Sequence, residues 1–225
     1  MEFSKSNSRR QFISTLALGA TAGLSALTQP LKAAVPFSSA EVSEAEQWLK
    51  SNLKGSHRVV IDGTEPNDAF PLIWTWVYYL GNNQTSVADS DMTALCVLRH
   101  NAIPFAMEDR LWEKYNFGEI FNVKDNTTKS PAIRNPYYEP KPGDFPVPTI
   151  DGIKRMQERG ALFTVCNLAI MVYSGEVAKQ LGLDPEEVRK DWVEGLLPGV
   201  QVSPSGVWAV TRAQENGCSY VYAGG

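Results

Sequence analysis

The stretch Ala161-Leu162-Phe163-Thr164-Val165-Cys166 is a short and almost continuous apolar run, and Asn167 follows it directly. Runs of this length without polar alternation are typical of strands that are buried on both faces of a parallel sheet. Residues 168–173 then have helix-like composition, so the cysteine lies where a strand ends and a helix begins. Ligands of parallel α/β sheets bind beyond the carboxyl ends of the strands. The sequence therefore predicts that Cys166 lies at such a binding edge.

Cys166 has two interpretations. A helix N-terminus carries partial positive charge and free N–H groups, which stabilise a thiolate and lower the pKa of the thiol. On this interpretation Cys166 is a reactive nucleophile. Free cysteines are also among the most buried residues in proteins, and most of them only fill space. Spacing alone leaves both interpretations open.

The rest of the chain repeats the strand–helix pattern of this stretch. Strands are predicted at residues 58–62, 93–98, 161–166, 198–202 and 218–222. Helices are predicted at residues 38–50, 70–82, 108–115, 149–159, 167–182, 184–192 and 207–216. Strands that alternate with helices in this way predict an α/β protein with a mainly parallel sheet of about five strands.

Chemically capable side chains follow several of these strands. The positions at the strand ends are Asp62, His100, Cys166, Ser203 and Ser205. A parallel sheet brings its strand ends to one rim, where a cysteine and a histidine can form a nucleophile–base pair. Asp62 is expected either to orient His100 or to cap the following helix. Cys96 and Cys218 fall inside or at the start of strands and are predicted to be packing residues.

Residues 119–149 form a long proline-rich insertion without clear periodicity. Segments of this kind are often functional when they are ordered. We expect it to lie across the rim or against a neighbouring subunit, with Arg134 pointing inward to hold a carboxylate or a sulfur oxyanion. Asn135 should be extended, because Pro136 follows it. The alternative is a surface loop whose arginine faces water.

Composition excludes several classes of function. The formal net charge is −4, and no basic patch of the kind found in nucleic-acid-binding proteins is present. The chain has three cysteines and two histidines, whose spacings match no zinc or CxxC pattern, so no metal site is predicted. Glycine-rich phosphate loops are also absent from the sequence, so no nucleotide cofactor is predicted.

The first 35 residues have the three-part layout of an export signal: a basic start, a mild apolar run and small residues near a cleavage site. Arg9 and Arg10 in the stretch Ser8-Arg-Arg-Gln-Phe-Ile13 resemble the twin-arginine signature. The expected partner is therefore the twin-arginine translocation machinery, and the expected location is the periplasm. The apolar run is too short and too rich in glycine for a comfortable membrane anchor. A single domain is expected over residues 36–225.

Three groups of residues resemble the DsrE/DsrF-like sulfur-relay family. One is Leu197-Pro-Gly-Val-Gln-Val-Ser-Pro-Ser-Gly-Val207 before a helix, and another is Gln214-Glu-Asn-Gly-Cys-Ser-Tyr220 near the end. Residues 98–109, Trp112-Glu-Lys-Tyr115 and Arg134-Asn-Pro136 are similar to the middle of exported members whose substrate is unknown. The resemblance covers most of residues 58–222.

This resemblance implies a three-layer α/β/α fold, a homo-oligomer and a cysteine that carries persulfide sulfur, at the position of Cys166. One hypothesis is thus a periplasmic sulfur-handling protein, a persulfide carrier or sulfurtransferase-like, with Cys166 and His100 as its catalytic pair. The other is a non-catalytic periplasmic protein that binds a small molecule or an anion. The candidate substrate-binding residues are Arg134, Asn135, Asp62, Asp109, Trp112 and Ser205. Six aromatic residues either line the pocket of such a binding protein or belong to the core and a subunit interface. They are Trp74, Trp76, Trp112, Tyr115, Tyr137 and Tyr138.

Overall fold

A five-stranded sheet runs through residues 38–224, the part of the chain that the computed structural model describes. The strands are β1 (His57–Gly63), β2 (Met92–Leu98), β3 (Leu162–Cys166), β4 (Val200–Ser203) and β5 (Ser219–Tyr222). Their order is β4-β3-β2-β1-β5, and every neighbouring pair is parallel. The predicted α/β class and parallel five-stranded sheet are confirmed. The export signal predicted at residues 1–35 lies outside the described residues.

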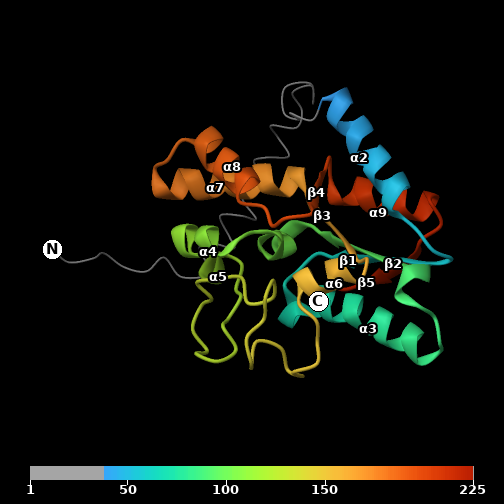
Figure 1. The fold of residues 1–225 in the computed structure, drawn as a ribbon. Coiled ribbons are helices and arrows are strands. Elements are labelled where there is room, and N and C mark those ends of the chain that lie inside the picture. Colours follow the sequence, from blue (N-terminus) through green and yellow to red (C-terminus); the bar gives the residue numbers. More distant parts are fainter. Residues whose placement is uncertain (1–37, 225) are drawn as a thin grey trace. The chain divides into compact units, whose positions relative to one another are not determined.

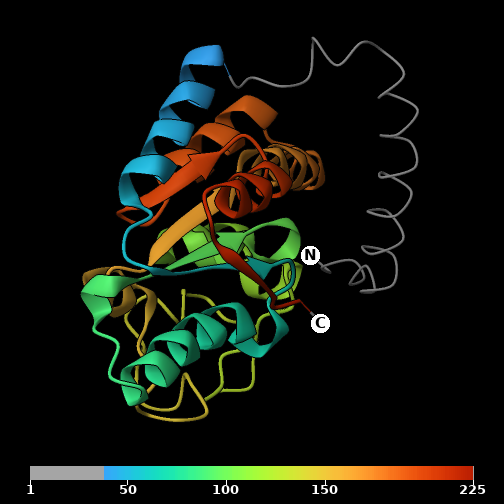
Figure 2. The ribbon, with the colours of Figure 1, turned by 90° about the vertical axis from the view of Figure 1, so that its right-hand side faces the viewer.

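The strand order decides which helices cover which face. The chain runs from β1 to β4 in one direction across the sheet and then returns past β1 to β5. Right-handed crossovers therefore place α3 (Phe70–Gln84) and α9 (Gly206–Glu215) on opposite faces. Figures 1 and 2 show α3 on one side of the sheet, and α9 together with α2 (Ser39–Asn52) on the other. This is the expected three-layer α/β/α arrangement.

The remaining helices lie in the connections between the strands. They are η4 (His100–Ala106), α4 (Asp109–Tyr115), α5 (Phe117–Ile120), α6 (Ile153–Glu158), α7 (Asn167–Leu181) and α8 (Pro185–Glu194), with two short 3-10 turns, η2 (Asn67–Ala69) and η3 (Asp89–Asp91). Figure 1 shows α4, α7 and α8 gathered toward one end of the sheet. Since α7 begins where β3 ends, this is the carboxyl end.

Burial explains why the strands read as apolar runs. Every residue of β2 is buried, as are the last four residues of β3. Trp112 is fully buried, and its indole N–H donates to the carbonyl of Met107 at 3.2 Å. Tyr115 and Tyr137 are buried too, whereas Trp74 on α3 is partly exposed. The core interpretation therefore holds for the aromatic side chains of α4.

Asp191 of α8 ties that helix to α4. Its carboxylate accepts hydrogen bonds from Lys114 Nζ at 2.7 Å, from Tyr115 OH at 2.7 Å and from Arg110. Partial burial opposes ionisation, but these donors outweigh it and lower the pKa of Asp191 to about 2. The ionised carboxylate therefore contributes to stability at neutral pH.

Replacing Asp191 by asparagine is expected to lower the free energy of unfolding at neutral pH by about 1 to 2 kcal/mol, because solvent screens part of the network. The folded pKa lies below the unfolded value, so this contribution is complete above the unfolded pKa and is lost as the pH falls through the folded pKa. Urea unfolding of both proteins should show the difference narrowing between about pH 4 and about pH 2. A difference that does not change with pH would contradict the role of the ionised carboxylate.

Candidate functional site at the carboxyl rim of the sheet

Asp62 near the end of β1 is buried and binds Arg99, the first residue after β2. Arg99 Nε and Nη2 donate to the two carboxylate oxygens at 2.6 and 3.0 Å, and Tyr220 OH donates to Oδ2 at 2.8 Å. Asp62 therefore neither orients His100 nor caps a helix, and both expectations were wrong. Arg99 was missed, although it follows a buried strand as directly as His100 does.

Cys166 is the N-cap residue of α7. Its sulfur accepts a hydrogen bond from the backbone N–H of Ala169 at 3.3 Å, and Cys166 is buried. The pKa of Arg99 is raised, first by its hydrogen bond to Asp62 and to a smaller extent by Cys166, so the guanidinium is within electrostatic reach of this thiol. Cys166 thus lies at the N-terminus of a helix and near the ion pair of Arg99 and Asp62.

The other two cysteines have different surroundings. Burial raises the pKa of Cys96 to about 12, and burial also raises the pKa of Cys218. Desolvation disfavours the charged form of a thiol, so both groups stay protonated at neutral pH. Their predicted role as packing residues agrees with these positions.

The turn between β4 and α9 completes this side of the rim. Ser205 caps α9, because its hydroxyl accepts the backbone N–H of Trp208 at 3.1 Å. A Cβ atom at Gly206 would lie 2.5 Å from two carbons of Arg99, so only glycine fits against that side chain. Ser203 is buried and hydrogen-bonded to Thr164. Ser205 thus has a structural role in holding the turn around Arg99.

His100 belongs to a second polar group at the same rim. Its Nδ1 lies 2.9 Å from Glu65 Oε1, and Asn101 Nδ2 donates to Glu65 Oε2 at 2.8 Å. Tyr173 OH donates to Asn101 Oδ1 at 2.5 Å, and the Tyr173 and His100 rings are 5.9 Å apart, edge to face. Glu65, Asn101 and Tyr173 were not among the residues predicted from the sequence.

The structure shows no hydrogen bond between Cys166 and His100 among the described residues. Tyr173, which contacts His100, lies seven residues after Cys166. Seven residues of α-helix rise about 10 Å. The two groups share the rim, and the nucleophile–base pair stays a prediction.

The backbone under this second group is strained. His100 has φ +52°, and Asn67, Asp68 and Ala69 after β1 have φ +39°, +49° and +69°. Residues with a Cβ atom seldom adopt this left-handed region, and such conformations cluster at functional sites. The strain falls in the two turns that carry Glu65 and His100.

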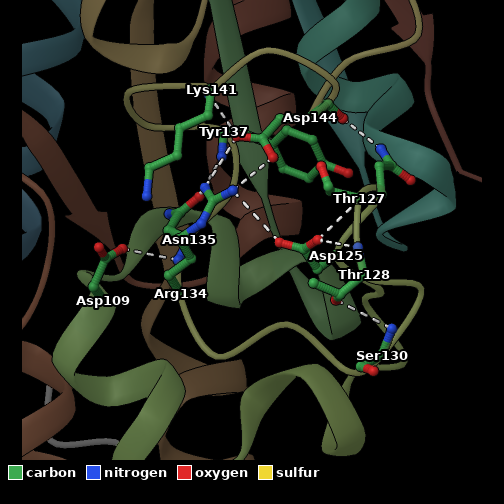
Figure 3. Close-up of polar contacts among 11 residues, drawn as sticks. Asp109, Asp125, Thr127, Thr128, Ser130, Arg134, Asn135, Tyr137, Lys141 and Asp144 are labelled. Carbon is green, nitrogen blue, oxygen red and sulfur yellow. Dashed lines mark hydrogen bonds and ion pairs between the residues drawn. The ribbon is translucent and has the colours of Figure 1, made fainter.

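Arg134 does not present a free guanidinium at the rim. Its Nη1 and Nη2 donate to the two oxygens of the buried Asp144 at 3.0 and 2.6 Å, and Nη2 also lies 3.5 Å from Asp125 Oδ2 (Figure 3). Its fork binds a carboxylate, as the residue type suggests, but that carboxylate comes from its own segment. The expectation of an arginine that is available for an external anion was wrong, and so was the alternative of an arginine that faces water.

Asn135 and Asp109 anchor the same segment, whereas Trp112 packs in the core against Phe105 and Phe117. Asn135 is buried; its Nδ2 donates to the carbonyls of Phe105 and Met107 at 3.0 and 2.9 Å, and its N–H donates to Asp109 Oδ1 at 2.9 Å (Figure 3). These contacts bind the insertion to η4 and α4, which lie beyond the end of β2. Their geometry gives Asn135 and Asp109 a structural role.

The insertion also approaches the His100 group at its start. The rings of Phe121 and Tyr173 lie 5.3 Å apart, and Tyr173 in turn contacts His100. Aromatic pairs at this separation attract each other beyond their burial alone. One end of the insertion therefore reaches the rim through Tyr173.

Comparisons with known proteins assign no family. No family model matches the chain, and no curated protein matches it. A solved structure of a protein of unknown function, MTH1491 from Methanobacterium thermoautotrophicum, is similar with a TM-score of 0.38 and 16% identity, covering 74% of this chain and 99% of that one. This similarity is too low to carry information about function.

Two features are absent from residues 38–224. No group of three His, Cys, Asp or Glu side chains there is arranged to hold a metal ion. No helix in that range is long and apolar enough to cross a membrane.

Proposed function

We propose that this protein handles sulfur in the periplasm, with Cys166 as a persulfide carrier or a sulfurtransferase-like nucleophile. The observation that carries the proposal is the position of the Cys166 sulfur, which accepts the Ala169 N–H at the N-terminus of α7 within electrostatic reach of Arg99. The thiolate is the form of a cysteine that attacks sulfur. The sequence resemblance to sulfur-relay proteins supports the same residue.

The reaction expected at Cys166 is thiol exchange. The thiolate attacks a terminal sulfur of a polysulfide, a new S–S bond forms, and the old S–S bond breaks. The shortened polysulfide leaves with the electron pair of the broken bond. Cys166 is then a persulfide, and the electrons balance without a further oxidant.

Mass spectrometry of the purified protein after polysulfide treatment tests this assignment. We expect one or more added sulfur atoms on the peptide that contains Cys166, and their loss in Cys166→Ser. Cys96→Ser and Cys218→Ser are matched controls and should load as the wild type does, because burial keeps both of these thiols protonated. Sulfur found only on Cys96 or Cys218 would refute the proposal.

A non-catalytic binding role is the second candidate. The polar group of Glu65, His100 and Asn101 favours it, because these side chains are partly exposed beside the ring of Tyr173. Binding sites combine apolar surface with a few placed polar groups. A thermal-shift screen with small anions and sulfur compounds separates the candidates, since stabilisation that survives Cys166→Ser would favour binding over thiol chemistry.

A further inference from the structure

Hydrogen bonds join Tyr173, Asn101, Glu65 and His100 in series, and the donor and acceptor of each bond can be assigned. Tyr173 OH donates to Asn101 Oδ1, which leaves the Asn101 amide nitrogen as the donor to Glu65 Oε2. An ionised carboxylate can only accept hydrogen bonds. The contact between Glu65 Oε1 and His100 Nδ1 at 2.9 Å therefore requires a proton on Nδ1.

The neutral imidazole of His100 then has its lone pair on Nε2. The partner of one ring nitrogen decides which tautomer a histidine adopts, and so which nitrogen can accept a proton. More than half of the His100 side chain is exposed, so a small ligand can reach the ring. The arrangement leaves an acceptor nitrogen available to solvent at the rim of the sheet.

The surrounding backbone indicates that this arrangement is specific. His100 itself and the three residues after Pro66 adopt left-handed conformations although none is glycine. Each such conformation costs on the order of 1 kcal/mol and persists only where the surroundings impose it. The strained positions lie in the two turns that carry Glu65 and His100.

We propose that Glu65, Asn101 and Tyr173 fix the Nδ1–H tautomer of His100 and make its Nε2 an acid–base site for a small, weakly acidic ligand such as a thiol. Glu65 is a positioning residue in this site, and His100 is the group that takes the proton from the ligand and returns it. The proton moves between the ligand and Nε2, and no other reactant is needed. The proposal does not depend on Cys166, because no hydrogen bond among the described residues joins His100 to its sulfur.

Glu65→Gln is the decisive variant. Asn101 Nδ2 still needs an acceptor, so the glutamine oxygen faces Asn101 and its NH2 group faces His100 Nδ1. Nδ1 must then accept, and the proton moves to Nε2. Nitrogen–proton correlation NMR, at a pH where the imidazole is neutral, should show Nδ1–H in the wild type and Nε2–H in the variant.

Carbethoxylation by diethyl pyrocarbonate gives a second readout, because it requires a free imidazole lone pair. We expect Glu65→Gln to slow modification of His100 about tenfold, which corresponds to one charge-assisted hydrogen bond. His57, the other of the two histidines, is exposed at the start of β1 and serves as the internal reference. Its rate should not change.

Two further variants separate this effect from general disturbance. Glu139→Gln replaces an exposed carboxylate that pairs with Lys154 and should leave both histidines as in the wild type. Tyr173→Phe removes the hydrogen bond to Asn101 but keeps the Glu65 carboxylate, so the proton should stay on His100 Nδ1. A wild-type spectrum with Nε2–H, or equal His100 rates in wild type and Glu65→Gln, would overturn the proposal whatever the outcome of sulfur loading at Cys166.

Discussion

Replacing Arg134 with alanine is expected to lower the free energy of unfolding by about 3 kcal/mol, because the change leaves a buried carboxylate without its partner. The Asp144 side chain is completely buried, and Arg134 supplies two hydrogen bonds to it. Asp144 also accepts the backbone N–H of Lys141, and that single bond cannot replace a charged partner. Chemical denaturation monitored by tryptophan fluorescence measures the loss.

The same change should expose the insertion to proteases. Arg134 and Asp144 lie within residues 119–149, so the segment loses its central ion pair, and its tip should be cleaved faster. Arg155→Ala is a matched control, since it breaks the exposed pair with Glu158 and should cost less than about 1 kcal/mol. Arg134→Lys should fall between the two, because lysine keeps the charge without the bidentate fork. Equal stability of Arg134→Ala and Arg155→Ala would contradict the buried pair.

The sequence predicted those strands and helices whose formation depends on residues that are close together in the chain. The strands that end at Leu98 and Cys166 are buried on both faces. Each of them therefore appears in the sequence as a continuous apolar run, with helical segments before and after it. The helix that begins after Asp184 carries its signal in three residues, since the Asp184 side chain caps the N–H groups of Glu186 and Glu187. Signals of this kind do not depend on the rest of the fold.

The partners of the charged groups could not be predicted in this way. Arg99 and Asp62 are 37 residues apart, and only the pairing of β1 with β2 brings them together. Arg134 was expected to hold an external anion, but its fork is occupied by Asp144 from the same proline-rich segment. Residue type indicates which contact a side chain can make, whereas tertiary proximity decides with which group it makes it.

The location of the candidate site at the carboxyl edge of the sheet was predicted from the sequence, but the contacts between its residues were not. Parallel topology puts Cys166 and His100 at the same edge, as expected. The residues that surround His100 come from the turn after β1 and from the second turn of α7, and no periodic pattern marks them. The left-handed backbone of His100 was equally hidden, because glycine is the usual signal for that conformation.

Replacing Asp62 with alanine is also expected to lower the free energy of unfolding by about 3 kcal/mol. The Asp62 side chain is 4% exposed and accepts three hydrogen bonds, two from Arg99 and one from Tyr220. Its removal leaves the guanidinium without a counter-charge in a site where Gly206 packs against the arginine stem. Thermal and urea unfolding of the two proteins measure the effect.

Tyr220→Phe is the matched control for Asp62→Ala, because it removes one of the three hydrogen bonds and keeps the ion pair. Its cost should be about 1 to 2 kcal/mol, the value of a hydrogen bond to a charged group at a partly exposed position. Asp62→Asn keeps the shape and one acceptor but loses the charge, so its cost should lie between those of the other two variants. If Tyr220→Phe were as damaging as Asp62→Ala, the tyrosine contact rather than the pairing of Asp62 with Arg99 would hold the ends of β1, β2 and β5 together.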